Sequence, residues 1–268
     1  MNKTVNVRAS SWGTLFDCGY RWEGVNLLKI RSPSSPRALL GSAIHASTAA
    51  FDVGRMNGAD VSAYDASELL VNVLRNPVED VNWKGSDITL DQAEAIGLKL
   101  HSMYCKDWSP KFEFAAIELQ VKPMPLDVGG GLTLVLTGTL DRARFFNGRR
   151  GIGMADVKSG GASVSNGVAK TKGHSAQIGT YEILYEHTTG NAITEDAEII
   201  GMKTRGKPEI AMGKLAGARE RMLGNENFKG LIQIGGDMIR SGLFPPNPSS
   251  HICAKAYCPR WNSCPYHE

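Results

Sequence analysis

The most constraining feature of the sequence is a strand-like stretch between residues 112 and 157. Apolar and β-branched residues alternate with polar ones over 114–121, 132–146 and 151–157, and a Gly-Gly-Gly run and the pair Asn147-Gly148 separate these segments. Alternation with a period of two predicts strands with one buried face, and such turn residues favour hairpins. The stretch therefore predicts an antiparallel meander.

Helical patterns lie on both sides of this meander. Apolar residues recur at helical spacing over 10–28, 38–56, 61–74 and 90–108 before it, and over 173–187 and 211–240 after it. A further strand is expected at 197–203. This order predicts an α/β fold in which a mixed central sheet is flanked by helices. We expect a single domain over 1–268, with a mainly helical part at 1–110, a core at 111–242 and a cysteine-rich tail at 243–268.

Composition narrows the class of protein only slightly. With 268 residues, of which 42% are hydrophobic, the chain can bury one substantial core. The net charge of +3 suits a nucleic-acid partner and equally suits many ordinary enzymes. No apolar run reaches the roughly 18 residues of a membrane span, and the polar start lacks the apolar stretch of a signal peptide. We expect a soluble, cytoplasmic protein without membrane contact.

Two neighbouring predicted strands each carry an aspartate near their ends. Asp141 lies in the first, and the second has Asp156 followed two positions later by Lys158. Because alternate residues of a strand share a face, Asp156 and Lys158 point the same way, and antiparallel pairing can bring Asp141 beside them. Carboxylates are suitable ligands for magnesium or manganese, which can activate water, and a lysine can stabilise charge on a phosphodiester. The other interpretation is an exposed, solvated strand face.

Four motifs together resemble the RecB-like branch of the PD-(D/E)xK nucleases, and they span most of the chain. In chain order they are Gly-Ser-Ala-Ile-His45, Gly-Thr-Leu-Asp141-Arg, Asp156-Val-Lys158-Ser-Gly and Gln177-Ile-Gly-Thr-Tyr181. The resemblance implies that His45 and the two aspartates bind Mg²⁺ or Mn²⁺ and that Lys158 assists catalysis. It also implies that Gln177 and Tyr181, which share a helical face, support the site and the DNA.

The resemblance implies a restriction-endonuclease-like core that hydrolyses DNA. Exonuclease action on single-stranded or frayed ends is expected, in recombination, repair, phage DNA metabolism or CRISPR adaptation. Helicase, recombination or adaptation proteins are the expected partners, and an oligomer is compatible with the sequence. The alternatives are a DNA-binding or scaffold protein that has lost catalysis on this fold, and a zinc-bound structural module.

The cysteines form a second signal, because three of the five lie within the last sixteen residues, at positions 253, 258 and 264. An odd number without an export signal argues against a disulfide framework. Three thiolates need a fourth ligand to complete a zinc site or a four-cysteine iron-sulfur cluster, and Cys18 is the natural candidate. Zinc with the same four cysteines, or with His251 in place of one, and separate buried thiols are the alternatives. Cys105 is expected to be a packed thiol.

Some RecB-like nucleases, including the AddB nuclease domain and the CRISPR adaptation exonucleases, hold a 4Fe-4S cluster with one N-terminal and three C-terminal cysteines. This chain is similar in that division, in its final C-x5-C spacing and in the adjoining prolines. The resemblance implies that Cys18, Cys253, Cys258 and Cys264 hold such a cluster. The chain departs from those relatives by placing four residues, rather than two, between Cys253 and Cys258.

The sequence leaves the roles of two further features undecided. Glu118 precedes the meander's hairpins and either approaches the aspartates or lies on a solvated strand face. A basic set that follows the catalytic strands either contacts a DNA backbone or forms a charged surface; it comprises Lys170, Lys172, His174, Lys203, Arg205 and Lys207.

Overall fold

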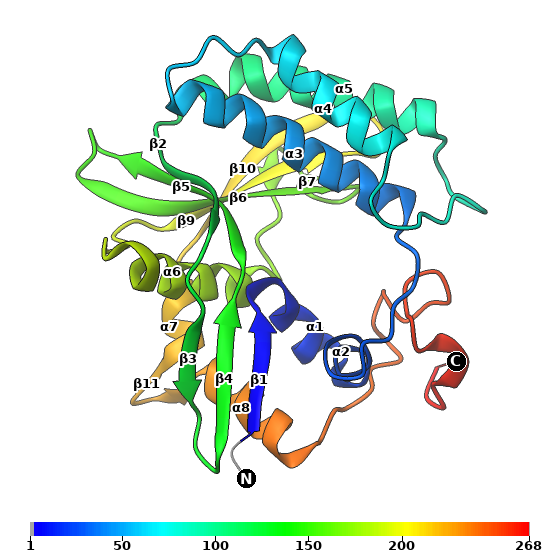
Figure 1. Ribbon diagram of the computed structural model, residues 1–268, viewed down its shortest axis with the longest axis vertical. Coiled ribbons are helices and arrows are strands. Elements are labelled where there is room, and N and C mark those ends of the chain that lie inside the picture. The colour runs from blue at the N-terminus through cyan, green and yellow to red at the C-terminus, as the bar shows by residue number, and fades with distance from the viewer. Residues whose placement is uncertain (1–2, 268) are drawn as a thin grey trace.

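The computed structural model describes residues 3–267 and confirms a mixed α/β fold (Figure 1). At its centre is a five-stranded mixed sheet, in which β6 pairs with β5 in antiparallel and with β9 in parallel orientation. The order across the sheet is β10 (Glu209–Leu215), β9 (Ala197–Lys203), β6 (Gly151–Gly160), β5 (Thr139–Phe146) and β2 (Phe114–Gln120).

The two ladders of β6 end at different points. Its pairing with β5 stops at Ala155, opposite Arg142, whereas its pairing with β9 continues to Gly160. Strands β5 and β6 therefore part where Asp141 and Asp156 lie, and the gap leaves backbone groups of β6 open to side chains.

A second, three-stranded sheet lies below the first in Figure 1. In it β4 (Leu132–Thr137) is central, parallel to β1 (Lys3–Arg8) and antiparallel to β3 (Met124–Asp127). The expectation of one strand over 132–146 was wrong, because the chain leaves one sheet and enters the other at Gly138. A Cβ at Gly138 would lie 2.8 Å from Cε1 of Tyr181, so glycine allows this close crossing.

Three helices cover one face of the five-stranded sheet (Figure 1). They are α3 (Pro36–Met56), α4 (Ala63–Arg75) and α5 (Leu90–Asp107). The side chain of Ser35 accepts a hydrogen bond from the amide of Ala38 at 3.2 Å, and α4 and α5 each begin with a capping box. These caps explain why the predicted boundaries of the three helices agree closely with the structure.

The opposite side of the sheet is covered by α6, which contacts β6 and also packs against α7. The expected helix over 211–240 was wrong at its start, because residues up to Leu215 form β10 and pair along the whole of β9. The pattern of these residues fits a strand and a helix equally well. Their ladder with β9, which is distant in sequence, makes them a strand. The remaining elements are α6 (Ser175–Thr189), α7 (Ala218–Leu223), α8 (Leu231–Ser241), β7 (Val164–Ser165), β8 (Val168–Ala169), β11 (Gly224–Asn225) and β12 (Phe228–Lys229).

The expected first helix is interrupted at Cys18, which has an extended backbone (φ −142°, ψ 94°) between α1 (Trp12–Asp17) and α2 (Gly19–Asn26). The tail beyond Ser241 runs back to these helices and contains one short 3-10 turn, Trp261–Ser263. Across residues 3–267, none of the helices combines the length and apolarity that a bilayer crossing requires.

Candidate active site and cysteine pocket

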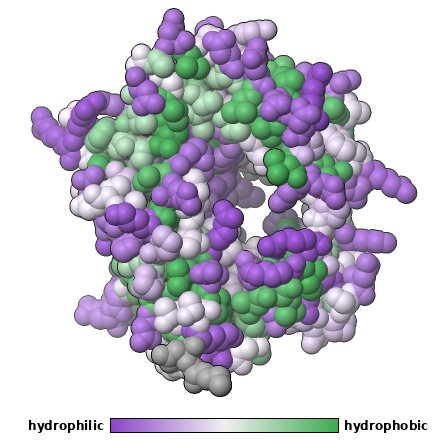
Figure 2. Space-filling view, viewed as in Figure 1, coloured by the Kyte–Doolittle hydropathy of each residue, from purple (hydrophilic) through white to green (hydrophobic). Residues whose placement is uncertain are grey.

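A cleft of about 920 Å³ lies between α3, the parting strands and α6. Figure 2 shows the molecule hollowed between the layer of α3 and the region of α1 and α2, with hydrophilic residues at the edges of the opening. Five of the six residues expected in catalysis line the cleft, and Asp156 lies buried behind Lys158. Together with Glu118, the lining residues that bear on chemistry are His45, Asp141, Lys158, Gln177 and Tyr181.

His45 and Asp141 face each other across the cleft wall. Nδ1 of His45, on α3, lies 3.4 Å from Oδ2 of Asp141, and the amide of Val157 donates to that same oxygen at 3.0 Å. This hydrogen bond uses the gap between β5 and β6. Burial lowers the pKa of His45 more than the Asp141 carboxylate raises it, so the imidazole is neutral and able to bind a metal.

Asp156 and Lys158 form an ion pair on alternate positions of β6. Apart from this pair, the Asp156 oxygens meet no hydrogen-bond donor within the described residues, and only 2% of Asp156 is exposed. Burial, followed by the negative charge of Asp141, raises the pKa of Asp156 to about 7. For Lys158, burial alone would lower the pKa, but Asp156 and Asp141 outweigh it and raise the pKa. A buried carboxyl in this state ionises more readily beside a cation.

Glu118 combines the two alternatives that the sequence left open, because its side chain is exposed and also approaches Asp141. In the β2–β5 ladder, Ile117 lies opposite Arg142 and Leu119 opposite Leu140, so Glu118 lies across from Asp141. One ligand atom each from His45, Glu118 and Asp141 fall within 4.8 Å of one another. An imidazole nitrogen with two carboxylate oxygens is a donor set that fits a divalent cation such as manganese or magnesium.

The second helical motif lies opposite this group. Gln177 and Tyr181, one turn apart on α6, both line the cleft. Burial, with the Asp141 charge, raises the pKa of Tyr181 to about 12, so its hydroxyl remains protonated and able to donate. On the other wall, a Cβ at Gly41 would lie 2.8 Å from Oγ of Ser159. Glycine at this position lets α3 lie against the end of β6 and brings His45 to the cleft.

A buried polar network lies directly beneath the cleft. Arg142, which follows Asp141, pairs its Nε with Oδ2 of Asp52 at 2.8 Å and donates from Nη2 to Oγ1 of Thr48 at 3.1 Å. Tyr104 donates to the same Asp52 oxygen at 2.7 Å. Thr48 and Asp52 lie on α3, about one and two turns beyond His45. The network therefore links the strand that carries Asp141 to the helix that carries His45. Sequence reasoning missed this connection, and its one local signal is the arginine that follows Asp141.

The cations that line the cleft are not those of the expected basic set. None of the six members of that set belongs to the described lining residues, and Arg8 and Arg37 lie there instead. Arg37 is held by Asp87, with Nε–Oδ1 and Nη2–Oδ2 distances of 3.1 and 3.0 Å, and donates to the carbonyl of Thr204 at 2.8 Å. Arg8 comes from β1, and its position depends on a strand that the sequence pattern did not reveal.

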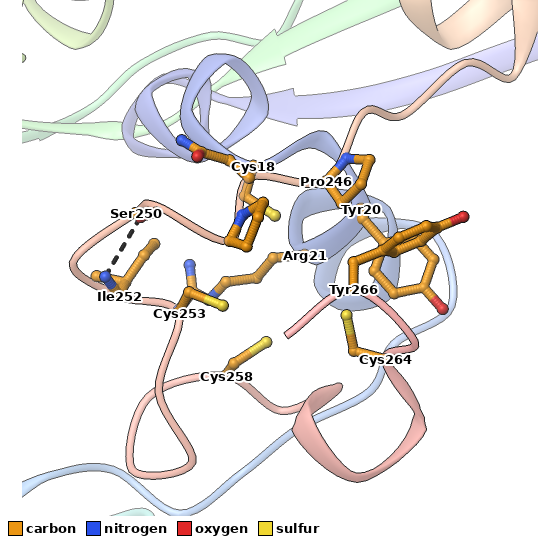
Figure 3. Close-up of a pocket in the computed structure, with 12 residues that line it drawn as sticks. Cys18, Tyr20, Arg21, Pro246, Ser250, Ile252, Cys253, Cys258, Cys264 and Tyr266 are labelled. Atoms are coloured by element: carbon orange, nitrogen blue, oxygen red, sulfur yellow. Dashed lines mark hydrogen bonds between the residues drawn. The ribbon is translucent and has the colours of Figure 1, made fainter. Parts of the chain in front are cut away.

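The four cysteines expected to act together line one pocket (Figure 3). Their sulfur atoms point into a shared space, with Cys18 reaching it from between α1 and α2 and the other three from the tail. All four are partly buried, and the structure shows no disulfide between them. Cys105 is buried in α5, as expected. Four thiols around one space match the donor number of a tetrahedral zinc site and of a four-cysteine cluster.

Side-chain contacts hold the tail against the N-terminal helices. Arg260 donates to Oε2 of Glu23 at 2.7 Å and lies 3.4 Å above the ring of Tyr20. Ser250 donates to Oδ2 of Asp17 at 2.6 Å, next to Cys18 in the chain. These contacts join segments more than two hundred residues apart and hold the tail beside the helices that flank Cys18.

No protein-family model matches the chain, and no curated protein matches it. Among solved structures, a candidate exonuclease from Eubacterium rectale has a TM-score of 0.46 and 12% sequence identity, covering 88% of this chain and 77% of its own. A likeness of this size does not identify an activity, so the chemistry of the cleft has to carry the functional interpretation.

Proposed function

We propose that this chain is a metal-dependent nuclease that hydrolyses phosphodiester bonds in DNA. The observation that carries the proposal is the convergence of His45, Asp141 and the Asp156–Lys158 pair at one cleft, from three of the four motifs. Magnesium or manganese held by His45, Asp141 and Asp156 would supply Lewis acidity and an activated water.

The residues of the chain have separate roles in this proposal. Lys158 lies at the cleft with its charge set by Asp156, and it stabilises the negative charge that develops on the phosphate. Gln177 and Tyr181 orient the substrate from α6 by hydrogen bonding. Arg8 and Arg37 contact the phosphates on either side of the bond that is cut, because they are the guanidinium groups lining the cleft.

We further propose exonuclease action on single-stranded or frayed ends. The cleft volume falls in the range of pockets that enclose small molecules, which suits a few nucleotides of one strand better than a duplex. In this proposal the residues that cut all come from one chain, and a helicase or recombination protein is a proposed partner.

A cleavage assay on labelled single-stranded and duplex DNA tests the proposal. We expect degradation that requires Mg²⁺ or Mn²⁺ and stops with a chelator, and we expect Lys158→Ala to lose it. Lys99→Ala, which removes an exposed lysine on the outer side of α5, is the matched control and should cut normally. A wild-type protein that binds DNA without cutting it would point instead to the non-catalytic alternative.

We also propose that Cys18, Cys253, Cys258 and Cys264 hold a 4Fe-4S cluster. Support comes from the four sulfur atoms that face one pocket and from the contacts that hold the tail against α2. Protein purified without oxygen should contain about four irons per chain and absorb broadly near ~400 nm. Colourless protein with about one zinc per chain would show that the same four ligands hold zinc instead of a cluster.

A further inference from the structure

Two arginines from distant parts of the chain meet on one carboxylate beside the cleft. Asp87, which lies in the loop before α5, accepts from Nε and Nη2 of Arg37 at 3.1 and 3.0 Å, and from Nη2 of Arg205 at 2.7 Å. Both Nη2 atoms donate to the same oxygen, Oδ2. The carboxylate therefore holds two guanidinium groups close together, although their like charges repel.

Further contacts fix the two arginines in place. Arg37, in the first turn of α3, also donates from Nη1 to the carbonyl of Thr204 at 2.8 Å. The side chain of Arg205 packs over Gly161, where a Cβ would lie 2.6 Å from Cδ of the arginine. Gly161 follows β6, and Thr204 and Arg205 follow β9. The cluster therefore joins the start of α3 to the ends of two central strands.

The cluster has an excess of positive charge and keeps hydrogen-bond donors. Two arginines, which stay protonated, outnumber the one carboxylate. Within residues 3–267, Arg37 makes one hydrogen bond from each of its three nitrogens and Arg205 uses only Nη2, so N–H donors remain on both. Ion pairs this exposed contribute little to folding, since 47% of the Asp87 side chain is accessible. Their geometry instead presents two oriented cations to an anionic ligand.

The cluster lies at the end of the cleft where α3 begins. Arg37 lines the cleft together with Lys158 and Ser159. At 1.5 Å per residue, about 12 Å of helix axis separates Arg37 from His45. An anion held by Arg37 is therefore a different group from one that lies beside His45.

We propose that Arg37 and Arg205 form a phosphate-binding site for the DNA strand in the cleft, and that Asp87 is the positioning residue of this site. The inference rests on the proposed function for the identity of the ligand, because a DNA strand carries a negative phosphate at every nucleotide. The planar guanidinium groups suit pairs of phosphate oxygens. The phosphate that they bind lies beyond the one at the bond that is cut.

Binding of labelled single-stranded DNA in the presence of a chelator, followed by fluorescence anisotropy, tests the inference without cleavage. Asp87→Asn removes a negative charge, so a purely electrostatic effect would tighten binding to a polyanion. We expect the reverse, because loss of the carboxylate releases both arginines and should weaken binding by about fivefold. Asp91→Asn is the matched control, because Asp91 is exposed in the first turn of α5, outside the cluster. It should bind within about twofold of the wild type.

Further variants separate positioning from folding. Asp87→Glu keeps the carboxylate and should recover part of the affinity, and the unfolding midpoints of both Asp87 variants should stay close to that of the wild type. Arg205→Gln should lower the slope of log affinity against log salt concentration by about 0.7, the contribution of one phosphate contact. Combined with Asp87→Asn, it should cost less affinity than the two changes added together, since Asp87 acts through the arginine. In the cleavage assay, Asp87→Asn should raise KM and leave kcat nearly unchanged.

The outcomes distinguish this inference from the proposed nuclease. If Asp87→Asn binds DNA as tightly as Asp91→Asn, or if Arg205→Gln leaves the salt dependence unchanged, the phosphate-binding site does not exist, whether or not the protein cuts DNA. If Asp87→Asn weakens binding as expected and the wild type cuts no DNA, the phosphate-binding site stands and the nuclease proposal is wrong.

Discussion

The cleft and the cysteine pocket are both assembled from segments far apart in the chain, but they are built differently. The cleft residues lie on strands whose ladders fix them and on α3, which the Arg142–Asp52 pair joins to β5. The cysteines lie at a break between two short helices and in a tail whose regular structure is one 3-10 turn. The difference teaches that strand ladders and a buried ion pair position the cleft residues, whereas side-chain contacts position the tail that carries three of the cysteines.

The largest effect on stability is expected from a change in the cysteine pocket, at Cys18. If the cysteines hold the proposed cluster, Cys18→Ser should release its metal and open the closure between the first helices and the tail. The free energy of unfolding should then fall by on the order of 5 kcal/mol. Denaturant unfolding of protein purified without oxygen, with metal analysis, measures both. Cys105→Ser is the control, because this thiol is remote from the pocket, and it should keep the metal. Unchanged metal content in Cys18→Ser would remove Cys18 from the site.

The second prediction concerns the buried ion pair between Arg142 and Asp52 beneath the cleft. Arg142→Met leaves the Asp52 carboxylate buried without its partner, and it should lower the free energy of unfolding by about 3–5 kcal/mol. Replacing both members, as Arg142→Met with Asp52→Leu, should cost less than the two single changes added together. Urea unfolding gives the three values. Additive effects would show that the pair does not join α3 to β5 as described.

A smaller effect on stability is expected from Glu182, which lines neither the cleft nor the cysteine pocket. Glu182 is buried on α6, and burial raises its pKa to about 7. An acid whose folded pKa is raised favours the folded state only while it is protonated, so its contribution is lost as pH rises from about 4.5 through 7. Glu182→Gln should match the wild type at pH 4 and exceed it by up to about 3 kcal/mol at pH 8. Parallel stability curves across this range would contradict the assignment.

The sequence predicted much of the cleft because its residues lie in local motifs. Asp156 and Lys158 needed only the alternation of one strand, and Asp141 needed only a hairpin partner. Glu118 could not be decided, because its side depends on the register between β2 and β5, which no local pattern reports. Arg8 was missed for a similar reason, since β1 is a short strand that pairs in parallel with β4 far along the chain.

The errors in secondary structure also occurred where non-local pairing decides. Residues 209–215 alternate and also suit a helix, and their ladder with β9 makes them a strand. The break at Cys18 lies between two residues, Asp17 and Glu23, whose tail contacts are beyond any window of sequence. The grouping of the cysteines was predicted from the clustering of three thiols in a tail with little core to enter, and from the resemblance that added Cys18 as the fourth.

The most direct test of the central claim is single-turnover cleavage of labelled single-stranded DNA at saturating Mn²⁺ by Asp156→Asn. The substitution keeps the shape of a buried side chain and removes its charge, so the unfolding midpoint should remain close to that of the wild type. We expect the cleavage rate to fall by about 10²–10³-fold, the loss typical of one preorganised electrostatic group. A rate within a few-fold of the wild type would contradict the assignment of this cleft as the cutting site.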